Sequence, residues 1–367
     1  MEKETRKNKS NSEDQKFLNP NQASAQDDSS LREISLVVER YSTHTGDGID
    51  GESTKHLAFE NESTFLLATY AGTLKLIKEK NEIFSGKMHR ANGGRIDNIA
   101  YARQLGSFFL LGSGHLFRKD IDDYPAYHYM DMPSVTYAQV MYLRYSGIHR
   151  RLIGVTQTKL RFIDLDQKRV DLMFSHSISG ILIDFVLFGK REDKVLSFNH
   201  KGQISFLIFN LELRKLLSSK RYQIGMIESR GESLSAIAVS DKNDHVLASI
   251  EGNFPRCSRT MIFEIKDNFL VQKAVIDHSK FAGLTKSQSA LSCCGRFGQH
   301  IMWVGLERGA GGRAHMYDYN VDTGDLEHLE DKSVDHQAEW VMKMVRQGDN
   351  FFYASEDGRV MKLRLKC

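Results

Sequence analysis

From about residue 31 onward, apolar residues alternate with polar ones or occur in short runs, and Gly, Asn, Asp and Ser bound these runs. Alternation with a period of two is typical of β-strands, whereas an amphipathic helix repeats its apolar positions about every 3.6 residues. The helical period is weak throughout this region. The pattern therefore predicts an all-β fold.

A hairpin unit recurs along the chain: an apolar strand, a turn that usually contains glycine, and a second strand of alternating apolar residues. In the last copy, FFYASEDGRVMKLRL, Asp357-Gly358 is the turn signal. The turns are about 40 to 60 residues apart, a spacing typical of propeller blades. The copies occupy residues 65–77, 108–121, 151–165, 195–209, 246–265, 301–319 and 351–365.

Each hairpin has room for two further strands, because apolar segments precede it, as at 98–102, and follow it, as at 169–175. Four strands in each of seven units predict a seven-bladed β-propeller over residues 31–367. We expect its blades to begin near residues 56, 96, 137, 181, 233, 288 and 337.

The two ends of the predicted propeller complement each other. The C-terminal hairpin lacks a following strand, and residues 32–39, REISLVVE, alternate as a lone strand without a partner nearby. Because an open edge leaves backbone N–H and C=O groups unpaired, we predict that 32–39 completes the last blade and closes the ring. Residues 1–30 are polar, with almost nothing to bury, and predict a disordered tail.

The last unit, DHQAEWVMKMVRQGDNFFYASEDGRVMKLRL, resembles a WD40 repeat. His336 stands where that family has the histidine of its Gly-His dipeptide, and Asp357-Gly358 stands at its tight turn. MKLRL replaces the strand that normally ends in Trp-Asp, a dipeptide that the sequence lacks. His176 holds the equivalent histidine position in SHSISGILIDF. The chain thus resembles a divergent WD40-like propeller, and this resemblance implies structural roles for these four residues.

Composition narrows the cellular setting. The formal net charge is +3, from 50 Lys and Arg against 47 Asp and Glu, which does not point to nucleic acid. No apolar run approaches the ~18 residues of a membrane helix, and the N-terminus lacks the apolar core of a secretory signal. The four cysteines form no CxxC pair, which favours free thiols in a reducing compartment. We expect a cytoplasmic protein, with the nucleus as the alternative.

Catalytic and metal motifs are scarce. The sequence contains no GxSxG, HExxH or P-loop motif. LERGAGGRAH is glycine-rich but does not lead into a helix, so we interpret it as a long hairpin loop and not as a phosphate cradle. Residues 115–131 concentrate histidines and carboxylates, yet without the ligand spacing of known metal sites. The sequence predicts neither an enzyme, nor a cofactor, nor a metal ion.

The WD40 resemblance implies where a partner binds. In that family, the loops between second and third strands and the loops between blades share one face, which grips peptides. The two longest second-to-third-strand loops here belong to predicted blades five and six, and both carry arginines. We expect this sector to bind an acidic or phosphorylated segment of a protein through charge-assisted hydrogen bonds. The candidate residues are Arg230, Arg256, Arg259, Arg308, Arg313 and Trp340.

The favoured function is therefore a non-catalytic scaffold or adaptor in a larger complex. One alternative is a phosphoinositide-binding propeller recruited to membranes, although the Phe-Arg-Arg-Gly motif of that family is missing. A second alternative is a propeller hydrolase, which would need histidine and carboxylate groups converging at the channel mouth. We expect protein partners, and no nucleic acid, membrane or small-molecule substrate.

Overall fold

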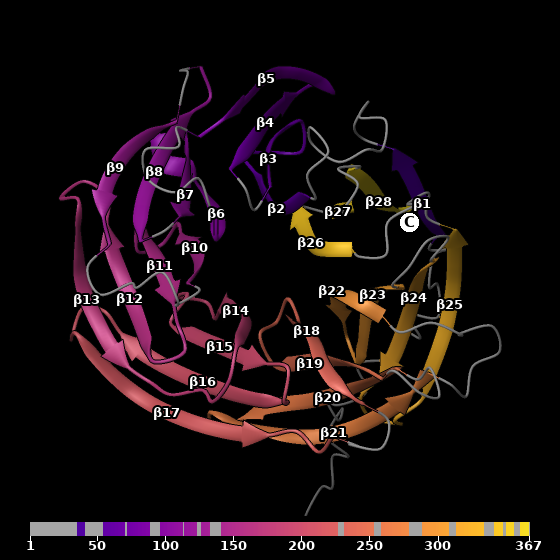
Figure 1. Ribbon diagram of the computed structural model, residues 1–367. Helices are drawn as coiled ribbons and strands as arrows, with labels where there is room; N and C mark the ends of the chain where they lie inside the picture. Colours follow the sequence, from indigo (N-terminus) through magenta and orange to yellow (C-terminus); the bar gives the residue numbers. More distant parts are fainter. Residues whose placement is uncertain are drawn as a thin grey trace, which may run out of the picture.

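A computed structural model shows a ring of seven four-stranded sheets around a central opening (Figure 1). Every strand pair in it is antiparallel, and the one helix among the described residues is a single 3₁₀ turn. The predicted all-β fold class is confirmed. The described residues are 35–40, 54–69, 72–88, 96–112, 114–122, 126–132, 141–226, 231–252, 258–278, 288–307, 313–333, 341–347, 350–355 and 360–366.

The first four blades follow one another along the chain, each with its first strand innermost. Blade one contains β2 (Thr54–Phe59), β3 (Thr64–Thr69), β4 (Thr73–Lys78) and β5 (Asn81–Lys87). Blade two contains β6 (Asn98–Ala102), η2 (Arg103–Leu105), β7 (Ser107–Gly112), β8 (His115–Asp120) and β9 (Tyr127–Asp131). Blade three contains β10 (Tyr142–Ser146), β11 (Arg151–Val155), β12 (Lys159–Asp164) and β13 (Arg169–Ser175). Blade four contains β14 (Leu182–Phe188), β15 (Lys194–Asn199), β16 (Gln203–Asn210) and β17 (Lys215–Gln223).

The remaining blades complete the ring. Blade five contains β18 (Ser233–Val239), β19 (His245–Glu251), β20 (Ser258–Lys266) and β21 (Phe269–Asp277). Blade six contains β22 (Gln288–Phe297), β23 (His300–Glu307), β24 (Arg313–Asn320) and β25 (Leu326–Ser333). Blade seven contains β26 (Val341–Gln347), β27 (Asn350–Ser355), β28 (Val360–Lys366) and, as its outermost strand, β1 (Ser35–Arg40).

Strand β1 joins the two ends of the described chain. It pairs antiparallel with β28, in a register that sets Ser35 opposite Lys366 and Arg40 opposite Met361. This pairing agrees with the predicted closure of the ring by an N-terminal strand. It gives the outer edge of β28 a backbone partner, as the cost of an open edge requires.

Blade seven and blade one contact each other through both aromatic and polar side chains. The ring of the fully buried Phe352 in β27 lies 4.6 Å from that of Phe59 in β2, centroid to centroid. The Glu62 carboxylate accepts a hydrogen bond of 2.6 Å from the side-chain amide of Asn350 and forms an ion pair of 3.2 Å with Nζ of Lys362. The first and last blades therefore contact each other through apolar and polar side chains, whereas the closing strand β1 pairs within blade seven.

Hydrophobic residues fill the spaces between adjacent blades. The second and third strands of a blade are covered on both faces, so β3 and β16 are buried along nearly their whole length. The outermost strand β17 instead alternates between exposed and half-buried positions. Strands covered on both faces have near-continuous apolar runs, and this is why the hairpins stand out in the sequence.

One turn depends on glycine for two reasons. Gly202, between β15 and β16, has a φ of +73°, a backbone conformation that L side chains rarely adopt. A Cβ there would lie 2.8 Å from Cε of Met226 and 3.2 Å from the carbonyl oxygen of Ile224.

Within the described part of the chain, no helix is long and apolar enough to cross a membrane.

Candidate partner-binding face

Chain direction assigns the loops to two faces of the ring. Strands alternate in direction within each blade, so the loops between second and third strands and the loops between blades emerge together. We call this side the loop face. It carries the described turns at 156–158 and 200–202 and the inter-blade segments 176–181 and 224–226.

Two of the predicted arginines lie on the loop face within the described residues. Arg313 is exposed at the start of β24. Arg259, near the start of β20, forms an ion pair with Glu232 and donates a hydrogen bond of 3.2 Å to the carbonyl oxygen of Gly225. The side chains of Arg259 and Glu232 are only 13% and 1% exposed. Since Glu232 directly precedes β18 and Arg259 lies at the start of β20, this buried pair joins two loops of the face.

The other predicted residues divide into two groups. His176 is buried directly after β13, and its backbone N–H donates a hydrogen bond of 3.0 Å to the carbonyl oxygen of Thr158. Burial lowers the pKa of the His176 imidazole, which favours the neutral ring near pH 7. Outside the described residues lie Arg230, Arg256, Arg308, Trp340, His336, Asp357 and Gly358.

The inner part of the loop face is cross-braced by hydrogen bonds between blades three, four and five. The side-chain amide of Gln157 donates to the carbonyl oxygen of Gly180 at 2.5 Å. The Ser179 hydroxyl lies 3.1 Å from the side-chain oxygen of Gln203, which also accepts from the Ser179 backbone N–H. The backbone N–H of Leu234 in β18 donates to the carbonyl oxygen of His200 at 3.0 Å. We call the loops 156–158, 176–181, 199–203 and 224–226 the braced rim.

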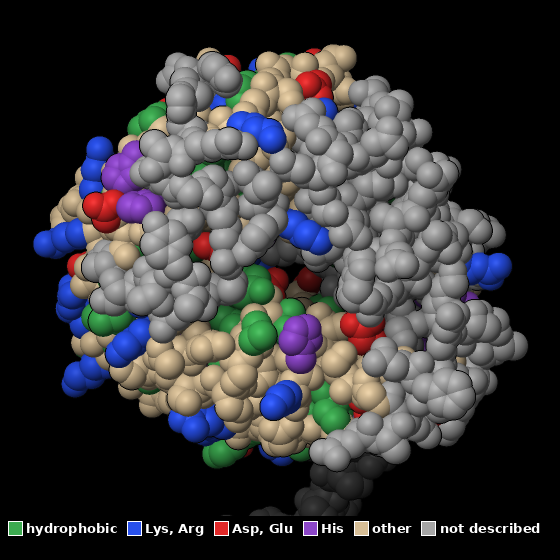
Figure 2. Space-filling view, viewed as in Figure 1, with side chains coloured by type: hydrophobic (Ala, Val, Ile, Leu, Met, Phe, Trp, Pro, Cys, Tyr) green, Lys and Arg blue, Asp and Glu red, His purple; other side chains and the backbone are tan. Residues whose placement is uncertain are grey.

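The braced rim presents an apolar side chain to solvent. Ile181 is 65% exposed, although it lies in a fixed frame at the inner end of blade four. Met226, in the inter-blade segment 224–226 of the rim, is half-buried. His200 and Lys201 are exposed in the turn between β15 and β16. Figure 2 shows hydrophobic side chains and a histidine beside the central opening on the face turned to the viewer. Among the large hydrophobic side chains of the described residues, Ile181 is the most exposed.

Sequence reasoning missed the braced rim for a specific reason. The segment ILIDFVLF predicts a strand that begins at residue 181, but β14 begins at Leu182. Ile181 therefore stays outside the sheet and points away from the blade core. The signal that could have found it is the Ser-Gly pair directly before it, which favours a turn over a strand.

An ion pair in the channel wall fixes the blades that carry the rim. Nη2 of Arg144 in β10 lies 2.6 and 2.7 Å from the two carboxylate oxygens of Asp184 in β14. The same guanidinium lies 5.1 Å from the ring centroid of Phe185. Arg144 thus connects the innermost strands of blades three and four.

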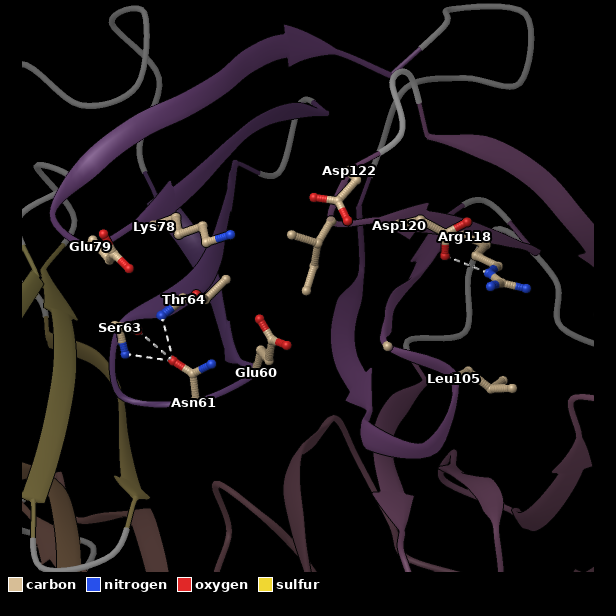
Figure 3. Close-up of a pocket in the computed structure, with 12 residues that line it drawn as sticks. Glu60, Asn61, Ser63, Thr64, Lys78, Glu79, Leu105, Arg118, Asp120 and Asp122 are labelled. Carbon is tan, nitrogen blue, oxygen red and sulfur yellow. Dashed lines mark hydrogen bonds and ion pairs between the residues drawn. The ribbon is translucent and has the colours of Figure 1, made fainter.

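A polar pocket of about 630 Å³ lies on the opposite face, between blades one and two (Figure 3). Its lining side chains bond mainly to one another or to nearby groups: Arg118 Nε lies 2.7 Å from Asp120, and the Tyr101 hydroxyl lies 3.1 Å from Glu60. Burial and the Glu60 carboxylate raise the pKa of Tyr101 to about 12, so the phenol stays protonated. Among the described lining residues, no nucleophile is paired with a base, and this pocket is separate from the loop face.

Comparison with known proteins supports the fold and not a specific function. No protein-family model matches the sequence, and no curated protein matches it either. The chain is similar in structure to the WD40 β-propeller domain of Doa1, with a TM-score of 0.57 at 10% identity over 90% of this chain and 97% of that one. It is also similar to the β-propeller domain of Cps50 (Swd1) from Myceliophteria thermophila, with a TM-score of 0.55 at 11% identity over 86% of this chain and 97% of that one. The chain has a divergent WD40-like propeller fold, as its last repeat predicts.

Proposed function

We propose that this propeller is a non-catalytic interaction scaffold that binds a segment of a protein partner on the braced rim. The observation that carries the proposal is the 65% exposure of Ile181 on loops held together by hydrogen bonds from three blades. The WD40-like fold supports the proposal at the level of class, because such propellers are commonly interaction domains.

Rigidity and apolarity together favour binding. A preorganised surface loses little conformational entropy when a partner docks. Apolar anchors near the centre of an interface supply most of the affinity, while the surrounding polar groups exclude water and set the register. Ile181 and Met226 fit the first role, and the exposed side chains of His200 and Lys201 fit the second.

We further propose that the bound segment also carries an acidic or phosphorylated part, separate from its apolar anchor. Arg313 is exposed on the same face, and the ion pair with Glu232 holds Arg259 at the neighbouring loop. Arginine binds carboxylate and phosphate groups through charge-assisted hydrogen bonds, often in pairs. In this scheme Arg313 contacts the partner, whereas Arg259 mainly maintains the shape of the loops.

The experiment compares exposed aliphatic positions on opposite faces. Ile181 is 65% exposed on the loop face, and Leu213 is 61% exposed in the β16–β17 turn of the other face. The full chain is purified with its partners from the native source, together with the variants Ile181→Asp, Arg313→Glu and the control Leu213→Asp. We expect Ile181→Asp and Arg313→Glu each to reduce the recovered partner at least tenfold, and Leu213→Asp to leave it unchanged.

Crosslinking gives an independent readout of the face. Lys201 lies in the braced rim, and Lys242 lies in the β18–β19 turn of the opposite face. Partner peptides should crosslink to Lys201 and not to Lys242. Equal recovery by all variants, or crosslinks at Lys242 alone, would contradict the proposal. Recovery of the protein with anionic vesicles in a flotation assay would instead favour the phosphoinositide alternative.

A further inference from the structure

A β-bulge in blade two brings together residues that a regular strand would separate. In the β8–β9 pair, His115 lies opposite Asp131 and Phe117 lies opposite His128, so β9 has one residue more than β8 between these positions. In a regular strand, residues three apart point to opposite faces. The bulge shifts this alternation, so that His128 and Asp131 share the face of His115.

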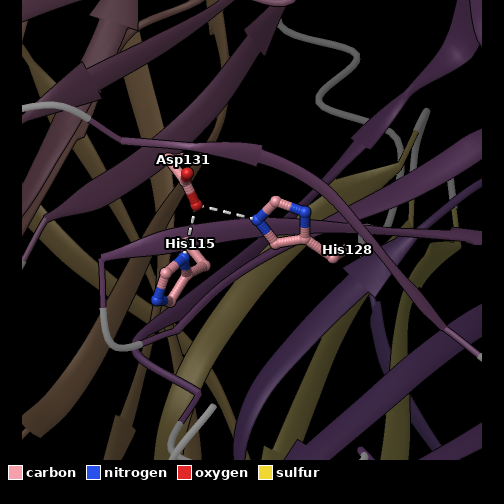
Figure 4. Close-up of side chains that lie close together, drawn as sticks. All are labelled: His115, His128 and Asp131. Carbon is pink, nitrogen blue, oxygen red and sulfur yellow. Dashed lines mark hydrogen bonds and ion pairs between the residues drawn. The ribbon is translucent and has the colours of Figure 1, made fainter. Parts of the chain in front are cut away.

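The three side chains converge on one carboxylate oxygen (Figure 4). Nδ1 of His115 lies 2.7 Å from Oδ1 of Asp131, and Nε2 of His128 lies 2.9 Å from the same oxygen. The candidate ligand atoms all lie within 4.8 Å of one another. The backbone N–H of Met132 donates to the carbonyl oxygen of Gly114 at 2.9 Å and holds the end of this strand pair together.

We propose that His115, His128 and Asp131 bind a divalent transition metal ion of the zinc class, with the remaining coordination position open to solvent. Two imidazoles and one carboxylate are a ligand set that zinc accepts, with an open fourth position in sites that keep water or another ligand. Imidazole ligands also suit copper and nickel, which compete for the same donors.

Small side-chain rotations turn the hydrogen-bonded cluster into a metal site. Bonds of about 2.0 to 2.1 Å in a tetrahedral site separate the ligand atoms by about 3.3 Å, against the present 2.7 and 2.9 Å from the imidazoles to Oδ1 of Asp131 and at most 4.8 Å across the whole set. The side chains of His115, His128 and Asp131 are 28%, 44% and 76% exposed, so they have room for these adjustments.

The proposed metal site is separate from the braced rim. It lies on the two outer strands of blade two, whereas the rim lies on the inner loops of blades three to five. The open coordination position faces solvent at the edge of the ring, where water or a donor group of another molecule can complete it. The two proposals are therefore independent, and a negative result for the metal site would not contradict the proposed partner-binding function.

The test titrates the metal-stripped full chain with Zn²⁺ by calorimetry and with Co²⁺ by absorption spectroscopy. We expect one ion per chain, and a Co²⁺ spectrum with visible bands but without a near-ultraviolet thiolate band. His115→Ala, His128→Ala and Asp131→Asn should each weaken binding at least tenfold. The control Asp322→Asn removes an exposed carboxylate from the β24–β25 turn of blade six and should leave the affinity unchanged.

Thermal melting of each variant without metal checks the fold, which substitutions at these exposed and half-buried positions should leave intact. The absence of saturable binding would overturn the proposal. So would equal affinity in the variants and the unaltered chain, or a thiolate band, which would place the ion on cysteines.

Discussion

Replacing Gly202 by alanine tests the link between the turn chemistry of the sequence and the braced rim. At this position the backbone has a φ of +73°, and an added Cβ would lie 2.8 Å from Cε of Met226 and 3.2 Å from the carbonyl oxygen of Ile224. Two costs therefore combine: a strained backbone and a steric contact. Both act inside the loops that present Ile181.

Two other glycines separate these costs. Gly106 has a φ of +61° with no heavy atom within 4 Å of its added Cβ, and Gly147 has neither strain nor contact. Gly147→Ala should be neutral or stabilise by up to about 1 kcal/mol, since alanine restricts the unfolded chain. Gly106→Ala adds the left-handed penalty of about 1 to 2 kcal/mol. Gly202→Ala adds the overpacking as well, at typically about 1 to 3 kcal/mol, so we expect it to be the most destabilising of the three by about that amount.

A double-mutant cycle isolates the steric part. Met226→Ala removes the flexible atom in the closest contact but leaves the carbonyl oxygen of Ile224 and the backbone strain in place. We expect Gly202→Ala to cost less in the Met226→Ala background by about 0.5 to 1.5 kcal/mol, a usual coupling energy for residues in contact. The assay is urea unfolding followed by circular dichroism, with the slope checked for constancy. If Gly202→Ala destabilised the protein no more than Gly106→Ala, the steric reasoning would be wrong.

Three further predictions concern the buried histidine His278, the buried ion pair of Arg259 with Glu232, and the closing strand β1. Burial lowers the pKa of His278 to about 3. Between about pH 6.5 and 3 the unfolded chain therefore binds a proton that the folded chain does not. The free energy of unfolding should fall over this range as the pH drops, by about 1.4 kcal/mol per pH unit from this group. His278→Asn should reduce that slope in unfolding experiments at pH 4 to 6, and an unchanged slope would refute the assignment. Arg259→Ala leaves the 1% exposed side chain of Glu232 without its guanidinium and should cost about 3 kcal/mol, most of which the double variant Arg259→Met with Glu232→Leu should recover. Deleting residues 31–40 removes the strand paired with β28 and should lower the melting temperature of the whole domain, whereas deleting 1–30 should not; equal melting temperatures would argue against closure.

The hairpins were predictable because their signal is local. A second and a third strand covered on both faces must be apolar along their length, and the turn between them needs residues such as glycine. Gly72, Gly114 and Gly202 lie within three of the predicted hairpins, and all three have positive φ in the structure. The candidate arginines were only partly accessible to the same reasoning, because the composition of a loop does not reveal whether a guanidinium is already paired, as that of Arg259 is.

The sequence by itself determined the all-β class and the repeating hairpin, because alternation and turn chemistry act between neighbouring residues. Only the tertiary structure decided which side chains meet across blades and strands. Ile181 and its frame depend on hydrogen bonds between residues more than 20 positions apart, and the convergence of His128 with Asp131 depends on a bulge. Register and bulges are set by the packing of each sheet against its neighbours, and hydrophobic periodicity along a single strand does not contain that information.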